Sequence, residues 1–232
     1  IDMLEHLNVR KEIIIQKSMS ILKEIIHRNK YITFYYLYKL EDDIINHIFD
    51  NNNTIIHYLS NDSKDILKLI LCLNNKIGER VNSQKQNILM TNIDKNIDII
   101  MILLEHIELI HLDNNNNNIL HYITRNERID ILKFMLNNKK YKEIILKYLD
   151  DQNNDGETAL IISTKNGNES LFNILYNIGA NMDLKDNLGN YTYHYICRNK
   201  MCIGMEIKNE KNKLGFCPSD YAEICTDYWK WI

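Results

Sequence analysis

The chain has 232 residues, and its 45% hydrophobic and 25% charged residues are the proportions of a globular protein rather than a disordered one. A formal net charge of −3 gives no overall attraction to nucleic acid or to an anionic membrane, and no apolar run approaches the ~20 residues of a transmembrane helix. The five cysteines lack the even number and regular spacing of a disulfide framework, which indicates a reducing, intracellular compartment. We therefore expect no nucleic-acid partner, no membrane partner and a cytoplasmic location.

The first 50 residues predict a helical cap followed by a compressed repeat. Apolar residues recur at helical spacing between residues 11 and 28, and two shorter apolar stretches follow at residues 31–40 and 43–49. These two stretches lack the long connecting loop of the units that follow them. Residue 1 is Ile rather than Met, and we expect native residues to precede it.

A tetrapeptide with a histidine at its second position recurs from residue 51 onward. Four copies stand out: Ile56-His57-Tyr58-Leu59, Leu120-His121-Tyr122-Ile123, Tyr193-His194-Tyr195-Ile196 and Leu160-Ile161-Ile162-Ser163, the last with Ile in place of the histidine. Residues 89–92 are a weaker copy. The second position falls at residues 57, 90, 121, 161 and 194, so the steps are 33, 31, 40 and 33 residues. A nearly constant period of this length is typical of stacked helical repeats.

An amphipathic stretch follows each of the first four tetrapeptides. Each begins with an acidic residue near the expected helix N-terminus, where negative charge is favoured, and carries apolar residues at i, i+3 and i+4. The four stretches are residues 65–71, 98–104, 130–136 and 169–175. Each unit is therefore expected to be a pair of helices, and the step of 40 residues predicts a longer helix or an added turn around residues 139–149.

The fourth unit resembles an ankyrin repeat. Residues 155–160, Asp-Gly-Glu-Thr-Ala-Leu, are similar to the start of that repeat, and residues 166–169 and 179–181 are similar to its central glycine turn and its end. The other units keep the helix pattern, although they lose the family's proline and in places its threonine and histidine. Residues 214–222 are similar to the start of a last repeat, with Pro218 in the first turn of a helix. The resemblance covers residues 30 to 225.

This resemblance implies an all-α fold, namely an ankyrin-repeat solenoid of about five to six helix pairs with terminal caps. We assign residues 1–50 to the N-terminal helical cap and compressed repeat, residues 51–200 to the ankyrin repeats, and residues 201–232 to a C-terminal capping repeat and an aromatic tail. The tail, Tyr228-Trp229-Lys230-Trp231, is expected to fold back over the last helices; the alternative is an exposed aromatic surface for a partner.

The residues that could carry chemistry do not form a catalytic or metal-binding pattern. His57, His121 and His194 are one repeat apart, which places them about 10 Å from one another, too far to share one metal ion. The histidine and cysteines between residues 194 and 225 match no zinc spacing. The chain has no phosphate-binding glycine loop and no nucleophile elbow. We expect no enzymatic activity, no metal and no cofactor.

The resemblance implies a protein partner, because ankyrin proteins bind proteins through the concave face formed by loops and inner helices. Ankyrin proteins of large DNA viruses have a similar Ile- and Asn-rich composition, which implies a viral or microbial protein that engages host factors, including in the host cytoplasm. The alternative is a structural or assembly component of a larger particle. The residues predicted to bind the partner are Asn61, Asp62, Asp94, Lys95, Asn115, Asn117, Arg125, Asn126, Asp155, Glu157, Lys165, Asn166, Leu188 and Arg198.

Overall fold

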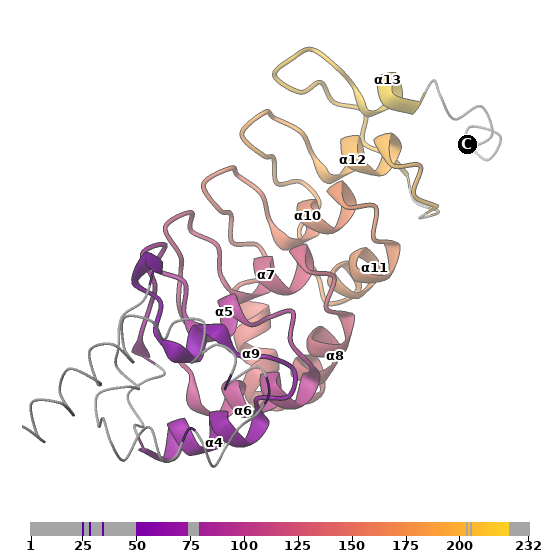
Figure 1. The fold of residues 1–232 in the computed structure, drawn as a ribbon. Helices are drawn as coiled ribbons and strands as arrows, with labels where there is room; N and C mark the ends of the chain where they lie inside the picture. Colours follow the sequence, from indigo (N-terminus) through magenta and orange to yellow (C-terminus); the bar gives the residue numbers. More distant parts are fainter. Residues whose placement is uncertain are drawn as a thin grey trace, which may run out of the picture. The chain divides into compact units, whose positions relative to one another are not determined.

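The computed structural model describes residues 50–73, 79–202, 204 and 206–222, together with Ile25, Arg28 and Phe34. The chain divides into two compact units, Ile1–Leu109 (unit 1) and Ile110–Ile232 (unit 2). From residue 50 onward the described residues form α-helices and short 3-10 helices, with no strand among them, which confirms the all-α class (Figure 1). Most of the cap predicted for residues 1–50, and the whole aromatic tail, lie outside the described residues.

Unit 1 contains two inner helical segments and two outer helices, preceded by the single 3-10 turn η1 (Asp50–Asn52). The inner segments carry the tetrapeptide and are η2 (Ile55–Tyr58) and α5 (Ile88–Thr91). The outer helices are the predicted amphipathic stretches, α4 (Lys64–Leu73) and α6 (Ile97–His106). α4 packs against α6, and α5 packs against both η2 and α6. The apolar positions of both outer helices are buried, as their spacing predicted.

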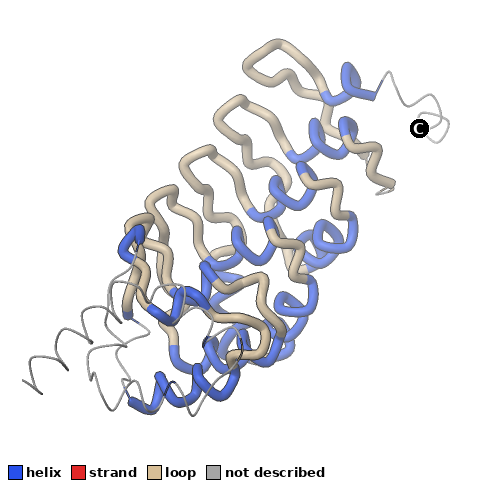
Figure 2. Tube along the Cα trace, viewed as in Figure 1, coloured by secondary structure: helices blue, strands red, loops and turns tan. Residues whose placement is uncertain are grey.

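Unit 2 repeats this arrangement. Its inner helices are α7 (Ile119–Arg125), α10 (Ala159–Lys165) and α12 (Thr192–Arg198). Its other helices are α8 (Ile129–Asn137), α9 (Lys139–Lys147), α11 (Glu169–Asn177) and α13 (Pro218–Ala222). α10 packs between α7 and α12, and a long loop leads into each of α10, α12 and α13 on the same side of the unit (Figure 2).

The first residue of the tetrapeptide is a core position in four of the five copies, Ile56, Leu89, Leu120 and Leu160, whereas Tyr193 in the last copy is only half-buried. Leu120 and Leu160 occupy this position in adjacent repeats and are both fully buried, with 0% of their surface exposed. Burial of a leucine side chain contributes about 1.5–3 kcal/mol to folding. The repeated hydrophobic position therefore accounts for much of the coupling between neighbouring repeats in unit 2.

A side chain just before three of the inner helices, α5, α7 and α10, caps the first turn of the helix. Asn87, Asn118 and Thr158 each accept the backbone N–H three residues on, at N···O distances of 2.9, 3.1 and 3.2 Å. Asn therefore replaces the family's threonine without loss of the cap, because the two residues are comparable N-caps. At Tyr191 no side-chain cap hydrogen bond forms, and α12 begins instead with the N–H of Tyr191 donating to Nδ1 of His194 at 3.1 Å.

The inner helices of unit 2 end in left-handed turns. Glu127, Gly167 and Lys200 follow α7, α10 and α12 with φ angles of 55°, 71° and 55°. The next residue in each turn donates its N–H back across the turn, to Ile123, Ser163 and Ile196 respectively, at 2.9 to 3.1 Å. Only one of the three turns has the glycine that suits this conformation, so two residues with side chains occupy a strained region in the other repeats.

The 40-residue step contains an additional helix. Asn138 donates its N–H to Met135 at the end of α8, and its side chain accepts the N–H of Lys140 at the start of α9. One residue thus ends one helix and caps the next. Tyr141 and Ile145 bury the inner face of α9. The prediction of a longer helix or an added turn is therefore resolved as a separate helix, α9.

The last repeats of unit 2 are shortened. Among the described residues between 201 and 213 there is no helix, so α12 has no outer helix as partner and packs instead against α13. α13 begins at Pro218, as the sequence predicted. None of the helices in the described ranges has the length and apolar character needed to cross a membrane.

Candidate functional site

Each long loop is organised by one Asn or Asp side chain at its first position. The Oδ1 atom of this residue accepts the backbone N–H groups two and four residues further on, at N···O distances between 2.8 and 3.0 Å. One oxygen therefore pairs two N–H groups that the loop would otherwise leave unpaired. We call these residues the loop anchors; they are Asn82, Asp113, Asn153, Asp186 and Asn212.

The fourth residue of each loop turns the chain back with a positive φ. This residue is Lys85, Asn116, Gly156, Gly189 or Gly215, with φ angles between 56° and 86°. Its N–H donates to the backbone carbonyl of the anchor at 2.9 to 3.1 Å. The backbone conformation of the loop is thus the same in every repeat, although the residue types at the turn differ.

Neighbouring loops of unit 2 are joined backbone to backbone. The second residue of each loop donates its N–H to the third residue of the preceding loop: Asn154 to Asn115, Asn187 to Asp155, and Lys213 to Leu188, each at 2.9 Å. A Cβ atom on Gly156 would lie only 2.7 Å from the backbone nitrogen of Asn187. The loops therefore stack at a separation that is fixed by hydrogen bonds.

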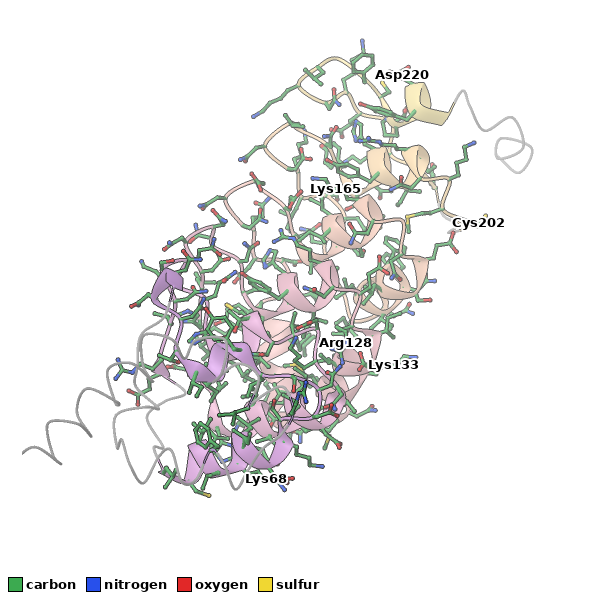
Figure 3. The ribbon with its side chains drawn as sticks, in the orientation of Figure 1. Lys68, Arg128, Lys133, Lys165, Cys202 and Asp220 are labelled. Carbon is green, nitrogen blue, oxygen red and sulfur yellow. The ribbon has the colours of Figure 1, made fainter. Side chains whose placement is uncertain are left out.

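Glu157 organises a polar cluster at the base of the loops. Its carboxylate accepts from Nζ of Lys165 at 2.5 Å and lies 3.6 Å from the guanidinium of Arg125. Nδ2 of Asn153 lies 3.3 Å from the same carboxylate and 3.0 Å from Oδ1 of Asn117. The Glu157 side chain is only 8% exposed and pairs with both basic residues. Lys165, the last residue of α10, is labelled in Figure 3.

Tyrosines support two of the anchors from the inner helices. The hydroxyl of Tyr122 donates to Asp113 at 2.8 Å, and that of Tyr195 donates to Asp186 at 2.5 Å. Although burial opposes ionisation, hydrogen bonds from Asn117, Tyr122 and the loop backbone lower the pKa of Asp113 below its usual value. Burial, followed by the hydrogen bond to Asp186, raises the pKa of Tyr195. Asp113 is therefore a charged acceptor.

The predicted partner-binding residues of unit 2 fall into three positions. Asn115, Asp155 and Leu188 are exposed third residues of the loops, whereas the fifth residues, Asn117 and Glu157, are buried and stabilise the loops from below. The inner-helix ends, with the residues after them, are exposed: Arg125, Asn126, Lys165, Asn166 and Arg198. We define the loop-side surface of unit 2 as the exposed third residues together with Arg125, Lys165 and Arg198.

The predicted residues of unit 1 lie in the turns between its inner and outer helices. Oδ1 of Asn61 accepts the N–H of Asn96 at 2.7 Å, so this side chain connects two adjacent turns. Lys95 pairs with its neighbour Asp94 at 2.8 Å, and Asp62 is exposed. The sequence predicted a row of basic residues from Lys95 to Arg198, with one in each repeat. Lys95 belongs to unit 1, and Arg125, Lys165 and Arg198 belong to unit 2.

Two exposed apolar side chains of the last loop were not among the predicted residues. Leu214 is the third residue of that loop and so corresponds to Leu188, and Phe216 is its fifth residue and corresponds to Glu157. Their side chains are 65% and 48% exposed. The signal that could have identified them is the spacing from the anchor Asn212, which equals the spacing in the other loops.

The tetrapeptide histidines connect one repeat to the next. Nδ1 of His57, His121 and His194 accepts the N–H of the residue three positions earlier, at 3.0, 3.2 and 3.1 Å. The proton is then on Nε2, which donates to the carbonyl of Glu157 from His121 at 2.9 Å and to that of Phe216 from His194 at 3.1 Å. Each of these carbonyls belongs to the following loop, so these two histidines support the loops.

These histidines are held neutral. Burial lowers the pKa of His57 from 6.5 to about 4, and burial also lowers the pKa of His121 and His194. A backbone N–H that points at Nδ1 of each ring fits a neutral imidazole. Among the described residues, no three His, Cys, Asp or Glu side chains form a group that could hold a metal ion.

The sequence matches two family models. The model for "Ankyrin repeats (3 copies)" matches residues 56–147, and the model for a single "Ankyrin repeat" matches residues 155–187. No curated protein matches the chain.

Solved structures share the fold. The chain is similar to a chain of the Bd0816 predatory endopeptidase from Bdellovibrio bacteriovorus in complex with immunity protein Bd3460, with 16% identity, a TM-score of 0.60, and coverage of 77% of this chain and 91% of that one. It is also similar to the ankyrin repeat domain of Bcl-3, a member of the IkappaB protein family, with 13% identity, a TM-score of 0.59, and coverage of 88% and 96%. At these identities the similarity is one of fold.

Replacing loop glycines by alanine should separate local strain from stacking between loops. Gly156→Ala places a Cβ against the next loop and should cost ~2–4 kcal/mol of unfolding free energy, because strain in a positive-φ turn is added to a steric clash. Gly215→Ala at the same loop position has nothing within 4 Å of its Cβ and should cost only about 1 kcal/mol. Urea denaturation of both variants checks this, and equal losses would show that the loops are not closely stacked.

Mild acid should destabilise the chain through its buried histidines. A histidine with a lowered folded-state pKa contributes stability that is complete above pH 6.5 and is lost as the pH falls toward its folded-state pKa, because the unfolded chain binds the proton first. For His57, with a pKa of about 4, the loss between pH 7.5 and pH 5 is about 2 kcal/mol.

His57→Met provides the control, because Met90 occupies the same position in the next repeat. Urea denaturation at both pH values should show a pH-dependent loss that is about 2 kcal/mol smaller in this variant than in the native chain. The same pH-dependent loss in both proteins would mean that His57 is not neutral in the folded state.

Proposed function

The chain belongs to the ankyrin repeat family, and we propose that it is a protein-binding module whose partner docks on the loop-side surface of unit 2. The observation that carries this proposal is the loop architecture. The loops are fixed by their anchor residues, by backbone hydrogen bonds between neighbouring loops and by buried histidines. The third residue of each loop nevertheless remains exposed. A surface that is ordered before binding loses little conformational entropy when a partner docks.

The charges of this surface favour a protein over a nucleic acid as the partner. A nucleic-acid interface needs several bases that are free to contact phosphates. Here Arg125 and Lys165 both pair with Glu157, and Asp155 adds an exposed carboxylate at a loop tip. Mixed charges of this kind select a complementary surface and tune the association rate more than the affinity.

Ankyrin repeats are typically non-catalytic interaction modules. The site supports this reading because the third residues of its loops are exposed, while the buried fifth residues stabilise the loops. One structural neighbour comes from a complex of two proteins, which also supports a protein partner. From the Ile- and Asn-rich composition we further infer a viral or microbial source and a host protein as the partner, in the host cytoplasm. The five scattered cysteines support a reducing compartment.

Charge reversal at a loop tip tests the proposal. Asp155 is exposed, and its loop contacts are made by its backbone, so Asp155→Lys should preserve the fold; Asn115 and Leu188 show that other side chains fit this position. The full chain is used as bait for affinity isolation from host cells, followed by quantitative mass spectrometry. A stoichiometric protein should be recovered by the native chain and reduced about tenfold by the variant.

Glu143→Lys on α9 is the matched control, because it makes the same charge change at an exposed helical position away from the loops. It should retain the partner. Equal recovery with both variants would place the binding site elsewhere. Recovery of an assembled particle in place of a single protein would support the alternative, a structural component.

A further inference from the structure

The loop-side surface of unit 2 changes character toward its last loops. The third loop residues are Asn115 and Asp155 in the earlier loops and Leu188 and Leu214 in the later ones, with the leucine side chains 55% and 65% exposed. The N–H of Lys213 donates to the carbonyl of Leu188, so these two tips are adjacent. Phe216, 48% exposed, is the fifth residue of the last loop. Clustered exposed apolar side chains of this kind mark interaction sites.

Arg198 differs in its ion pairing from the two basic residues that occupy the same position in earlier repeats. Arg125 and Lys165 contact Glu157, the fifth residue of a neighbouring loop. The corresponding fifth residues beside Arg198 are Asn190 and Phe216, and neither has a carboxylate. Asn190 already bonds Asp186 and Asn212. Within residues 79–202 and 206–222, Arg198 forms no ion pair and is exposed.

Arg198 occupies the helix position that, in α7, faces the fifth residue of the following loop, and that fifth residue is Phe216 here. His194 and Arg198 are four residues apart and therefore share one face of the helix. Nε2 of His194 donates to the carbonyl of Phe216 at 3.1 Å. Arg125 likewise follows His121 by four residues on α7, and its guanidinium lies 3.6 Å from the carboxylate of Glu157. Glu157 is the fifth residue of its loop and so corresponds to Phe216. Arg198, which has no ion-pair partner among the described residues, is therefore the basic residue that corresponds to the Phe216 position, and the centroid of the Phe216 ring lies 6.0 Å from that of the Tyr221 ring.

We propose that Arg198, Leu188, Leu214 and Phe216 form the principal contact site for the partner, and that they bind a segment carrying a carboxylate side chain next to a large apolar side chain. This inference rests on the proposed function and specifies its chemistry. The guanidinium pairs with the carboxylate in the two-bond geometry that arginine favours. The apolar side chain of the partner covers Leu188, Leu214 and Phe216. Arginine and aromatic residues are frequent centres of binding energy.

Other occupants fit the surface less well. A phosphate backbone needs several free bases, but Lys208 pairs with Glu210 at 3.1 Å, and Lys185 lies 3.8 Å from the same carboxylate. A second copy of the chain would have to be complementary to itself, which requires an available carboxylate beside Arg198. Glu210 is engaged with both lysines and with the hydroxyl of Tyr191. The site therefore offers a guanidinium that has no carboxylate partner among the described residues, next to an apolar surface.

Peptide selection tests the inference. The full chain is immobilised and used to select 12-residue peptides from a random phage-displayed library. The selected peptides should share an Asp or Glu beside Leu, Phe, Met or Trp. A selected peptide should bind the native chain about tenfold more tightly than its counterpart with the acid replaced by the amide, and this difference should vanish with Arg198→Gln.

Two further variants complete the test. The Leu188→Ser and Leu214→Ser double variant changes only exposed tips and should weaken the peptide about tenfold. Lys133→Gln, which removes one exposed positive charge on α8, away from the loop-side surface, should retain binding. Peptides that bind native protein and Arg198→Gln equally would overturn the inference while the proposed function stands, since the Asp155→Lys isolation tests that separately.

The remaining outcomes also decide against the inference. A selection that enriches no peptide would overturn it. Self-association seen by sedimentation and abolished by Arg198→Gln would assign the site to a second copy. Binding of a single-stranded 20-mer that is lost in the same variant would assign it to nucleic acid.

Discussion

The structure depends on one side-chain oxygen per repeat that accepts two backbone N–H groups. Each long loop would otherwise expose unpaired amides at its turn, and an unpaired amide that is buried costs about 1–3 kcal/mol. Because the anchor satisfies both groups, the loop can fold back tightly and stack on its neighbour. The inner helix, the buried histidine and the supporting tyrosine are arranged around this turn. The loop geometry of unit 2 is therefore constant while its exposed residues vary.

This division between fixed backbone and variable tips explains how the fold serves binding. The base of the loops uses its polar residues internally, as Glu157 does for Arg125 and Lys165. The tips are free to change from amide and carboxylate in the earlier loops to leucine in the later ones. The same scaffold position consequently forms an ion pair in one repeat, whereas Arg198 in another has no ion-pair partner among the described residues. We therefore propose that a single surface contains both stabilising and binding positions.

The sequence predicted the repeats because hydrophobic spacing is strong and periodic. The tetrapeptide register, the outer helices and the structural role of the histidines followed from it, and Leu120 and Leu160 are buried as expected. The loop anchors were not predicted, since Asn and Asp are common throughout the chain and periodicity does not distinguish them. Burial of Glu157 depends on contacts between repeats, which spacing does not encode. The described residues after α12 contain no outer helix because Asp186 and Asn212 are only 26 positions apart, whereas the preceding pair of anchors, Asn153 and Asp186, is 33 apart.

The central claim is that the anchor oxygen orders both its own loop and the next one. Amide hydrogen exchange of the native chain and of Asn153→Ala measures this directly. The account predicts that the Asp155 and Glu157 amides, which donate to Asn153, exchange roughly tenfold faster or more in the variant. The Asn187 amide, which donates to Asp155 in the stacked loop, should also accelerate, while α11 keeps its protection. Unchanged exchange at all three amides in a folded variant would contradict the claim.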